Sequence, residues 1–396
     1  MSKIYNVVKN HFCLGCGLCE SICPSYKMEM TPNGFYYPHF PQKRQKDKEV
    51  IMGRVCPSIN VSAPKGNDLI WGNIKTAYLG WANNEYIRKN SSSGGVVASL
   101  AIYLLENGLI DGFIHVKQDE NDLLKNVLTV SKTPEDVMKA SGSRYAPSLF
   151  LKEILQLLCK DNSVYAFAGK PCDIVAIKNL LKEYPQYKNR ILLCIAIFCG
   201  GVPSLNATKT LIGKNNFHDL VSLRYRGDGW PGYFIAKFKN GLELKKSYNE
   251  SWGEVLGHHV MFRCKICPDT IGLSADLTIG DGWKTKDGYP DFTESDGRSF
   301  VLVRTEDGKN YLQAASKQGR VIIEELPLTQ VKVMQPTQYH LRFIKFFRLI
   351  PFFVAYPGLF RFKGLNLLKL GFRADIKTAF REFKGSVKRF RKRNKY

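Results

Sequence analysis

The chain has 396 residues, of which 44% are hydrophobic and 23% are charged. These proportions are typical of a globular protein and exclude a disordered or membrane-spanning chain. The net charge of +23 is uneven, because residues 341–396 hold sixteen lysines and arginines against two acidic residues, a net charge of +14 for this tail.

The N-terminal ten residues contain no long apolar segment and no cleavage site of small residues. We therefore expect no export and a cytoplasmic protein. In a reducing compartment, eleven cysteines with short spacings are better explained as thiolate ligands of metals than as disulfides. At this length we expect one large domain with one or more small modules.

The first motif is CLGCGLCESICP, residues 13–24. Four cysteines at this spacing, followed by a proline, match the run that holds a four-iron cluster in bacterial ferredoxins. In two-cluster ferredoxins the fourth cysteine of such a run binds the other cluster, and the second run supplies the missing ligand. Here the second run is reduced to Cys56 and Pro57.

This exchange predicts a small ferredoxin-like α+β domain over residues 1–62 with one [4Fe-4S] cluster. Its predicted ligands are Cys13, Cys16, Cys19 and Cys56. Two alternatives stay open: Cys23 could replace Cys56 as the fourth ligand, or a zinc ion could be held by the four cysteines of residues 13–23.

Residues 75–330 alternate between strand-like and helical patterns, which predicts a large α/β domain with a mixed sheet. We place its two halves at residues 73–157 and 158–335. The strand-like segments are 76–82, 111–117, 190–201 and the first part of 163–172, which ends in a glycine-containing turn. The helical segments are 94–108 and 173–184.

Two turns in this domain could bind an anion. In SSSGG the candidate residues are Ser92, Ser93, Gly94 and Gly95, just before a helix whose first N–H groups favour phosphate. In SGSRY they are Ser143, Arg144 and Tyr145, which offer an arginine for a pyrophosphate and a tyrosine for stacking on a ring. An ordinary serine cap with flexible glycines is the alternative for the first turn.

A second group of cysteines follows strand ends and turns: Cys172, Cys199, Cys264 and Cys267. Because neighbouring strand ends converge in an α/β sheet, these four could hold a second [4Fe-4S] cluster. The alternative is that Cys172 and Cys199 are buried apolar cysteines and that Cys264 and Cys267 hold a zinc ion or no metal at all. Cys159 and Cys194 lie in apolar stretches, so we expect both to be buried apolar cysteines.

Six motifs stand in one order: SSSGG, LLENGLIDGFI, GKPC, CGGVPS, RYRGDGWPG and RCKICPDTIGLSADLTIGDGW. With them, residues 10–310 resemble the beta-subunit family of coenzyme F(420)-reducing hydrogenases and dehydrogenases. The resemblance implies a flavoprotein with FAD, a cluster held by the middle-domain cysteines and an N-terminal ferredoxin-like module. It also makes the SSSGG and SGSRY turns candidate FAD contacts.

The function so implied is an iron–sulfur flavoprotein oxidoreductase with two [4Fe-4S] clusters and FAD, reduced by a ferredoxin-like donor. A sugar-linked or lipid-linked intermediate of surface-polysaccharide synthesis is the substrate that the resemblance suggests. An electron-transfer subunit without a substrate of its own, and a zinc-stabilised scaffold, are the competing hypotheses. Lys170, Asp269 and Asp281 could assist with protons, although capping or turn roles are at least as common for such aspartates.

The tail, residues 340–396, begins with an aromatic segment whose uncharged run, 349–360, is too short to span a bilayer. Beyond it, we expect one amphipathic helix with basic residues flanking its apolar face. Its apolar positions are Leu365, Leu368, Phe372, Ile376, Phe380, Phe383, Val387 and Phe390. This pattern predicts binding to an anionic membrane surface, with the aromatic segment inserted shallowly. Packing on its own domain or on an acidic partner subunit is the alternative, and we expect no nucleic-acid binding.

Overall fold

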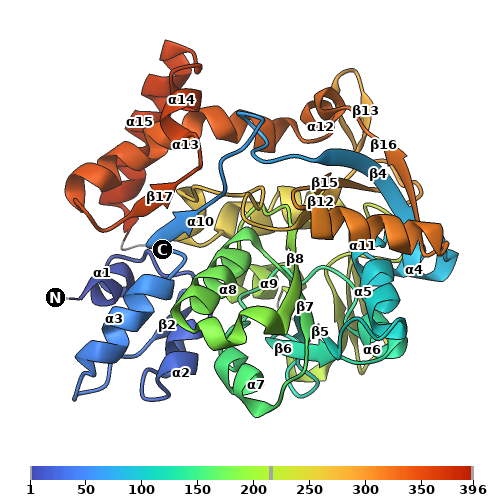
Figure 1. Ribbon diagram of the computed structural model, residues 1–396, viewed down its shortest axis with the longest axis horizontal. Helices are drawn as coiled ribbons and strands as arrows, with labels where there is room; N and C mark the ends of the chain where they lie inside the picture. Colours follow the sequence, from blue (N-terminus) through green and yellow to red (C-terminus); the bar gives the residue numbers. More distant parts are fainter. Residues whose placement is uncertain (1, 214–216, 394–396) are drawn as a thin grey trace.

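An eight-stranded sheet forms the centre of the computed structural model, which describes residues 2–213 and 217–393 (Figure 1). Its strands are β4 (Thr76–Ala82), β5 (Gly112–Gln118), β6 (Asn126–Ser131), β7 (Tyr165–Gly169), β8 (Ile191–Ile197), β12 (Leu277–Asp281), β15 (Ser299–Val303) and β16 (Val321–Glu325). The order across the sheet is β16-β4-β15-β12-β8-β7-β5-β6. The four strands β12, β8, β7 and β5 pair in parallel, and the other pairs are antiparallel. The predicted α/β class with a mixed sheet is confirmed.

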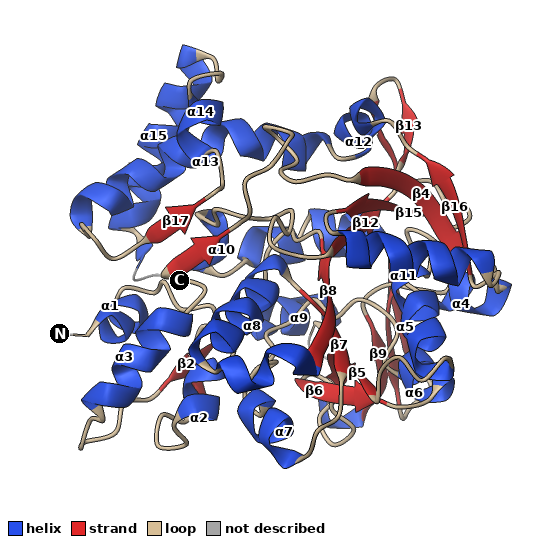
Figure 2. Ribbon diagram, viewed as in Figure 1, coloured by secondary structure: helices blue, strands red, loops and turns tan. Residues whose placement is uncertain are grey.

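Helices cover both faces of this sheet (Figure 2). They are α4 (Glu85–Asn90), α5 (Val96–Glu106), α6 (Pro134–Lys139), α7 (Ile154–Lys160), α8 (Pro171–Glu183) and α11 (Glu306–Lys317), whereas α9 (Leu205–Ile212) packs in a separate buried cluster. On one face α5 buries Leu100 and Leu104 against sheet residues such as Ile195. On the other face α8 buries Ile174 and Ile177. The elements predicted from residues 76 to 201 are all present, because their apolar spacing already matched a strand or a helix period.

The N-terminal domain consists of α1 (Lys3–Lys9), α2 (Leu18–Ile22), β1 (Met28–Met30), β2 (Tyr36–Pro38), α3 (Lys46–Val55) and β3 (Asn60–Ser62). Strands β1 and β2 form a two-stranded antiparallel sheet. Leu18 and Met52 of this domain share a buried cluster with Ile154 of α7 and Ile177 of α8. The small domain is therefore packed on the same sheet face as α7 and α8.

Several short elements after β8 were not predicted. They are β9 (Leu220–Arg224), β10 (Phe234–Phe238) and β11 (Glu243–Lys246), which form a three-stranded sheet, the helix α10 (Phe262–Lys265), the hairpin of β13 (Lys284–Lys286) and β14 (Tyr289–Asp291), and α12 (Leu328–Met334). Most of them are three to five residues long. Such short segments carry too few residues to show a hydrophobic period.

The C-terminal segment forms α13 (Pro336–Ala355), β17 (Arg361–Lys363), α14 (Leu367–Gly371) and α15 (Ile376–Arg391). The prediction of one helix through residues 365–390 is wrong. Asp375 caps a new helix by accepting a hydrogen bond from the Thr378 N–H at 2.8 Å. Gly371 lies so close to Phe346 that an added Cβ would stand 3.0 Å from its ring. The chain therefore turns at residues 371–375, and α15 packs back along α13.

The aromatic segment of the tail is part of the core. Phe352 is fully buried, and its ring lies 5.7 Å from Phe12 and 5.8 Å from Phe262. The expectation that this whole segment inserts into a membrane is wrong, because these rings already cover the N-terminal domain. Strand β17 pairs in parallel with β3, so the C-terminal segment lies against the end of the N-terminal domain (Figure 1). Within the described residues, no helix has the length and apolar character needed to cross a membrane.

Candidate functional site

Four cysteines of the N-terminal domain line one cavity. Cys13 and Cys16 lie in the loop before α2, Cys19 lies in its first turn, and Cys56 caps the C-terminus of α3. Burial raises the pKa of the Cys16 thiol to about 12, and the neighbouring charge of Cys56 adds to this rise. Burial is also the main cause of a raised pKa for Cys19, and the charges of Cys13, Cys56 and Cys16 raise it further. The four sulfurs are thus within electrostatic range of one another.

Cys23 lies outside this group. Its sulfur is 3.1 Å from the Ser25 hydroxyl, and it does not line the cavity that the other four cysteines share. Of the two sets of ligands that the sequence left open for the N-terminal domain, the geometry favours the one that contains Cys56.

The second group of cysteines comes together at the carboxyl ends of the parallel strands. Cys172 lies in the first turn of α8 after β7, Cys199 follows β8, and Cys264 and Cys267 lie in and just after α10. Burial raises the pKa of Cys199 to about 11, with the charge of Cys267 next. Burial raises the pKa of Cys264 to about 12, with Cys199 and Cys267 adding to it. Neighbouring parallel strands end at the same edge, which explains why residues 172 and 199 meet.

Three side chains lie within electrostatic range of both groups. Burial raises the pKa of Tyr37, and the charges of Cys13 and Cys264 add to the rise. Burial raises the pKa of both Cys56 and Cys264, and the positive charge of Arg263 partly offsets this rise in each. The ammonium group of Lys170 has the same lowering effect on the pKa of Cys16, Cys172 and Cys199. The two groups of cysteines are therefore neighbours across the boundary between the N-terminal domain and the α/β domain.

The residues present fit iron–sulfur clusters. Thiolates are the usual ligands of such clusters, and a cluster with four thiolates carries net negative charge. Arg263 is 1% exposed, and its hydrogen bonds within the described part of the chain go to the carbonyl oxygens of Ile266 and Ser58, at 3.1 and 3.3 Å. A buried cation held by carbonyls suits a site that receives negative charge. Among the described residues, no three or more His, Cys, Asp or Glu side chains are gathered tightly enough for a single metal ion.

The two turns that were predicted to bind an anion contact each other. The Ser143 N–H donates to the Ser92 hydroxyl, and the hydroxyls of Ser91 and Ser141 are 3.3 Å apart. Gly94 and Gly95 also have structural roles. A Cβ on Gly94 would stand 2.7 Å from the Gly80 oxygen, and Gly95 has a φ of +79° where α5 begins.

Arg144 is engaged with the protein itself. Its Nε donates to Asn126 at 2.8 Å, and its two terminal nitrogens donate to the carbonyls of Leu223 and Leu123 at 3.1 and 3.0 Å. Burial lowers the pKa of this guanidinium. Most of its donors are therefore occupied, so the arginine holds the SGSRY turn against β6 and β9.

An aromatic cluster beside Tyr145 was not predicted. Tyr145 lies 4.7 Å from Trp252, and Trp230 stacks on Trp283 at 4.6 Å. Arg226 donates two hydrogen bonds to Asp281, at 2.9 and 3.0 Å, and the Trp230 indole donates to the same carboxylate. The sequence holds a signal for this pair, because the four residues GDGW occur twice, at 227–230 and 280–283.

The possible proton-transfer residues have structural partners. Asp281 is paired as above, and Asp269 accepts from the N–H groups of Ile271 and Leu273 at 3.0 and 2.9 Å. Lys170 pairs with Asp173 at 2.6 Å. The turn and capping roles weighed for the two aspartates agree with these contacts.

The structure separates the two remaining cysteines. Cys194 is buried, as predicted. Cys159 is exposed, so the prediction that it is a buried apolar cysteine is wrong. Cys159 lies in the last turn of α7 with its sulfur 2.9 Å from the Tyr187 hydroxyl. An apolar stretch on a surface helix still presents one side to solvent.

Comparison with known proteins places the α/β domain in a family. Residues 77–154 match the model of the coenzyme F420 hydrogenase/dehydrogenase beta subunit N-terminus, and residues 163–328 match that of the C-terminus. The chain belongs to this family. The family is that of electron-transfer oxidoreductase subunits, and the iron–sulfur cysteines fit it.

Individual relatives agree with this assignment. The beta subunit of coenzyme F420 hydrogenase from Methanococcus voltae is 28% identical over 276 residues, which cover 66% of this chain and 88% of the relative. An uncharacterised protein of Methanocaldococcus jannaschii is 28% identical over 345 residues, 79% of this chain and 89% of its own. A chain of the F420-reducing [NiFe] hydrogenase complex from Methanosarcina barkeri shares the fold with a TM-score of 0.52 and 19% identity, over 71% of this chain and 92% of that chain.

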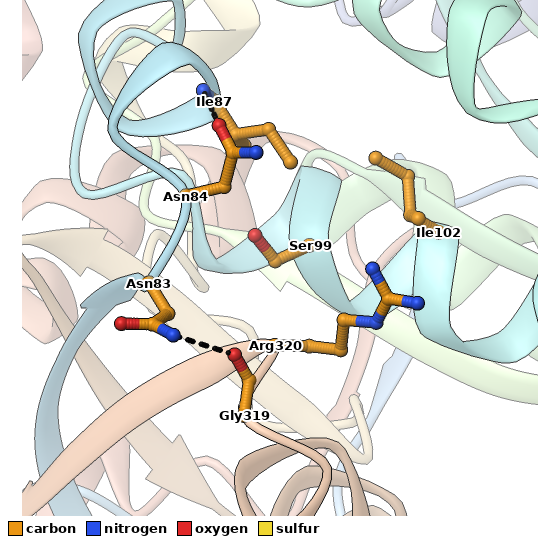
Figure 3. A pocket seen from close by; sticks show the side chains of 7 residues that line it. All are labelled: Asn83, Asn84, Ile87, Ser99, Ile102, Gly319 and Arg320. Carbon is orange, nitrogen blue, oxygen red and sulfur yellow. Dashed lines mark hydrogen bonds between the residues drawn. The ribbon is translucent and has the colours of Figure 1, made fainter.

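The family match covers only part of the site. Cys172, Cys199, Cys264 and Cys267 lie within the family's C-terminal region, whereas residues 1–62 and the helices after residue 328 lie outside both matched ranges. A further pocket lies away from the cysteines, between α4, α5 and the turn before β16 (Figure 3). Its lining includes Asn84, Ser99 and Arg320 and none of the predicted ligands.

Proposed function

We propose that this protein is an iron–sulfur flavoprotein of the F420 hydrogenase/dehydrogenase beta-subunit family that passes electrons through two [4Fe-4S] clusters and FAD. The observation that carries the proposal is the adjacency of two buried cysteine groups, which share Tyr37, Arg263 and Lys170 as neighbours. When bound, the flavin and the clusters supply conversion between two-electron and one-electron transfer.

The residues have separate tasks in this proposal. Cys13, Cys16, Cys19 and Cys56 hold the cluster of the N-terminal domain, and a second cluster is held by Cys172, Cys199, Cys264 and Cys267. Burial raises the pKa of Cys13 and Cys19 in the first group and of Cys172 in the second, so the surrounding protein shields both groups from water. Short separation and a dry, rigid surrounding are what one-electron transfer between two clusters requires.

We place FAD at the side of the SSSGG and SGSRY turns. The contact between Ser143 and Ser92 makes the two turns one surface, and the aromatic cluster of Tyr145, Trp252 and Trp283 supplies rings on which a flavin could stack. Because Arg144 is occupied, the serine hydroxyls of the two turns are the better candidates for contacts to the pyrophosphate.

We further propose that the protein works with a partner. The Methanococcus voltae relative is a subunit by its name, and a small cluster domain at the N-terminus gives a ferredoxin-like donor a natural contact surface. Electron transfer to a partner enzyme is therefore our preferred mode of action. A sugar-linked or lipid-linked substrate stays a prediction.

The test is anaerobic purification with iron, sulfide and flavin assays on the same sample. We expect about eight irons and one flavin per chain, and about four irons in either Cys56→Ala or Cys172→Ala. Cys159→Ala is the matched control, because this exposed cysteine belongs to neither group, and it should keep the full iron content. A colourless protein with zinc, or unchanged iron in both cysteine variants, would contradict the proposal.

The tail supports a second proposal, attachment to an anionic membrane surface. Four apolar side chains of α14, α15 and the turn between them face solvent: Leu368, Phe372, Ile376 and Phe380 are 50, 81, 87 and 58% exposed. The exposed cations Lys369, Arg373, Lys377 and Arg381 each follow one of them. Apolar residues flanked by cations suit the interface of an anionic bilayer.

Vesicle sedimentation tests this surface. The protein should bind vesicles of phosphatidylglycerol and not of phosphatidylcholine. Changing Phe372 and Ile376 to serine should weaken binding at least about tenfold, since burying one such side chain is worth about 1.5–3 kcal/mol. The control pair Val221→Ser and Leu242→Ser, also exposed, should change nothing. Absence of binding to anionic vesicles would overturn the proposal and leave an acidic partner subunit.

A further inference from the structure

Helix α13 lies outside the family match, yet it contacts the second group of cysteines. Gln338 donates from Nε2 to the backbone oxygen of Cys199 at 3.1 Å. Lys345, two turns later on the same side of the helix, contributes with Cys264 and Cys267 to the lining of one small cavity. A segment beyond the two matched ranges thus forms one wall of the candidate cluster site.

Thr270 joins these two side chains. Its hydroxyl donates to Gln338 Oε1 at 2.5 Å and accepts from Lys345 Nζ at 2.8 Å. The Thr270 carbonyl in turn accepts from the Cys199 N–H at 3.0 Å. The loop after Cys267 and the end of β8 are therefore tied to α13 by one continuous hydrogen-bonded network, which fixes the ammonium group beside the cysteines.

Lys345 is a buried cation without an ion-pair partner. It is 3% exposed, and among the described residues no carboxylate lies within 4 Å of its Nζ. Asp269 is within electrostatic range, but so are Arg342 and Arg348, and Asp269 is occupied by two backbone N–H groups. Burying a charge is costly unless an opposite charge lies nearby. The thiol of Cys267 is in range of the same ammonium group.

We propose that α13 is a built-in cap of the second cluster and that the Lys345 ammonium group raises the reduction potential of that cluster. The inference rests on the proposed function, since it needs a cluster on Cys172, Cys199, Cys264 and Cys267. It adds a residue that tunes this cluster and a reason why the chain continues beyond the α/β domain.

The physical basis is the charge that reduction adds. Reduction places one more negative charge on the cluster, and a fixed cation nearby stabilises the reduced form more than the oxidised form. The interaction is strong because the group is buried and held by Thr270. Removal of the charge should therefore lower the reduction potential, while replacement by another cation should preserve it.

The experiment is a potentiometric titration of the purified holoprotein, followed by low-temperature electron paramagnetic resonance. Lys345→Gln removes the charge and keeps a hydrogen-bond donor for Thr270, and Lys345→Met removes both. We expect one of the two clusters to titrate at a lower potential in both variants, and the other to be unchanged. Lys345→Arg should restore the original value. The control is Lys332→Met, which removes an exposed cation from α12 and should shift neither cluster.

The outcomes separate this inference from the proposed function. If the wild-type protein holds about eight irons and neither Lys345→Gln nor Lys345→Met shifts a potential, the cap exists without the tuning role and the inference is overturned. The inference is also overturned if the Lys345 variants shift the reduction potentials of both clusters equally, or if Lys332→Met shifts either potential. A general change in protein charge would then be the cause. If iron analysis shows no cluster on the second group, the proposed function itself fails for that site.

Discussion

Glu49 is a buried carboxylate on the helix that presents Cys56. Its side chain is 1% exposed and accepts hydrogen bonds from the Tyr26 hydroxyl at 2.8 Å and from Arg44 Nε at 2.7 Å, and it also bonds to Ser2. Burial alone would raise the pKa of Glu49, but the bonds from Arg44, Ser2 and Tyr26 outweigh it and lower the pKa to about 2. This network ties α3 to the loop after α2.

The sign and size of the effect follow from this pKa. Because the folded value lies below the ordinary value of 4.5, the stabilisation is fully present above pH 4.5 and is lost as the pH falls toward 2. A difference of about 2.5 pH units corresponds to about 3 kcal/mol at pH 7, and about 1.5 kcal/mol of it remains at pH 3. Glu49→Gln should therefore reduce the free energy of unfolding by about 3 kcal/mol at pH 7 and by about 1.5 kcal/mol at pH 3.

Urea denaturation followed by circular dichroism, at pH 7 and pH 3, measures the difference between wild type and Glu49→Gln. The chain should be stripped of iron, so that acid loss of clusters does not contribute. Glu29→Gln is the control, because Glu29 is exposed on β1 and should show no difference at either pH. An equal loss at both pH values, or no loss at pH 7, would refute the assignment of the stabilisation to an ionised Glu49.

Three further predictions concern the remaining sites. Cys23→Ser should keep the full iron content measured for wild type, and a loss of about four irons would show that Cys23 is a ligand. Phe352→Ala should reduce the free energy of unfolding by about 3–5 kcal/mol, whereas Val354→Ala, at a 77% exposed position, should change it by less than about 0.5 kcal/mol in the same urea titration. Asp281→Asn leaves the buried Arg226 guanidinium uncompensated, which should destabilise the protein by about 3–5 kcal/mol and weaken flavin retention on gel filtration; unchanged stability would contradict the pairing.

The elements of the α/β domain could be predicted because their information is local. Residues 76–82 and 191–197 are apolar over the length of a strand, and residues 171–183 carry an apolar face between a proline start and a polar end. The adjacency of Cys172 and Cys199 was predicted from the same source, since both follow strands that end at one edge of a parallel sheet. The short strands between β8 and β16 and the paired GDGW tryptophans had too little local pattern to be placed.

The tail shows where local information stops. Its spacing indicates helix over residues 365–390, but neither the turn that separates α14 from α15 nor the neighbour that covers an apolar side chain. In the structure, Leu349 and Phe352 of α13 pack against the N-terminal domain, whereas Phe372 and Ile376 stay exposed. Contacts between residues more than three hundred positions apart decide this division, and no spacing within the tail records them.

By itself, the sequence determined the fold class, the strand and helix order of the α/β domain and the two groups of cysteines, because each depends on spacing or on the chemistry of one residue type. Only the tertiary structure decided that the two groups adjoin, that Cys56 and not Cys23 lines the N-terminal cavity, and that α13 brings Lys345 to the second group. These arrangements depend on how separate elements pack, and packing is fixed by shape and burial across the whole chain.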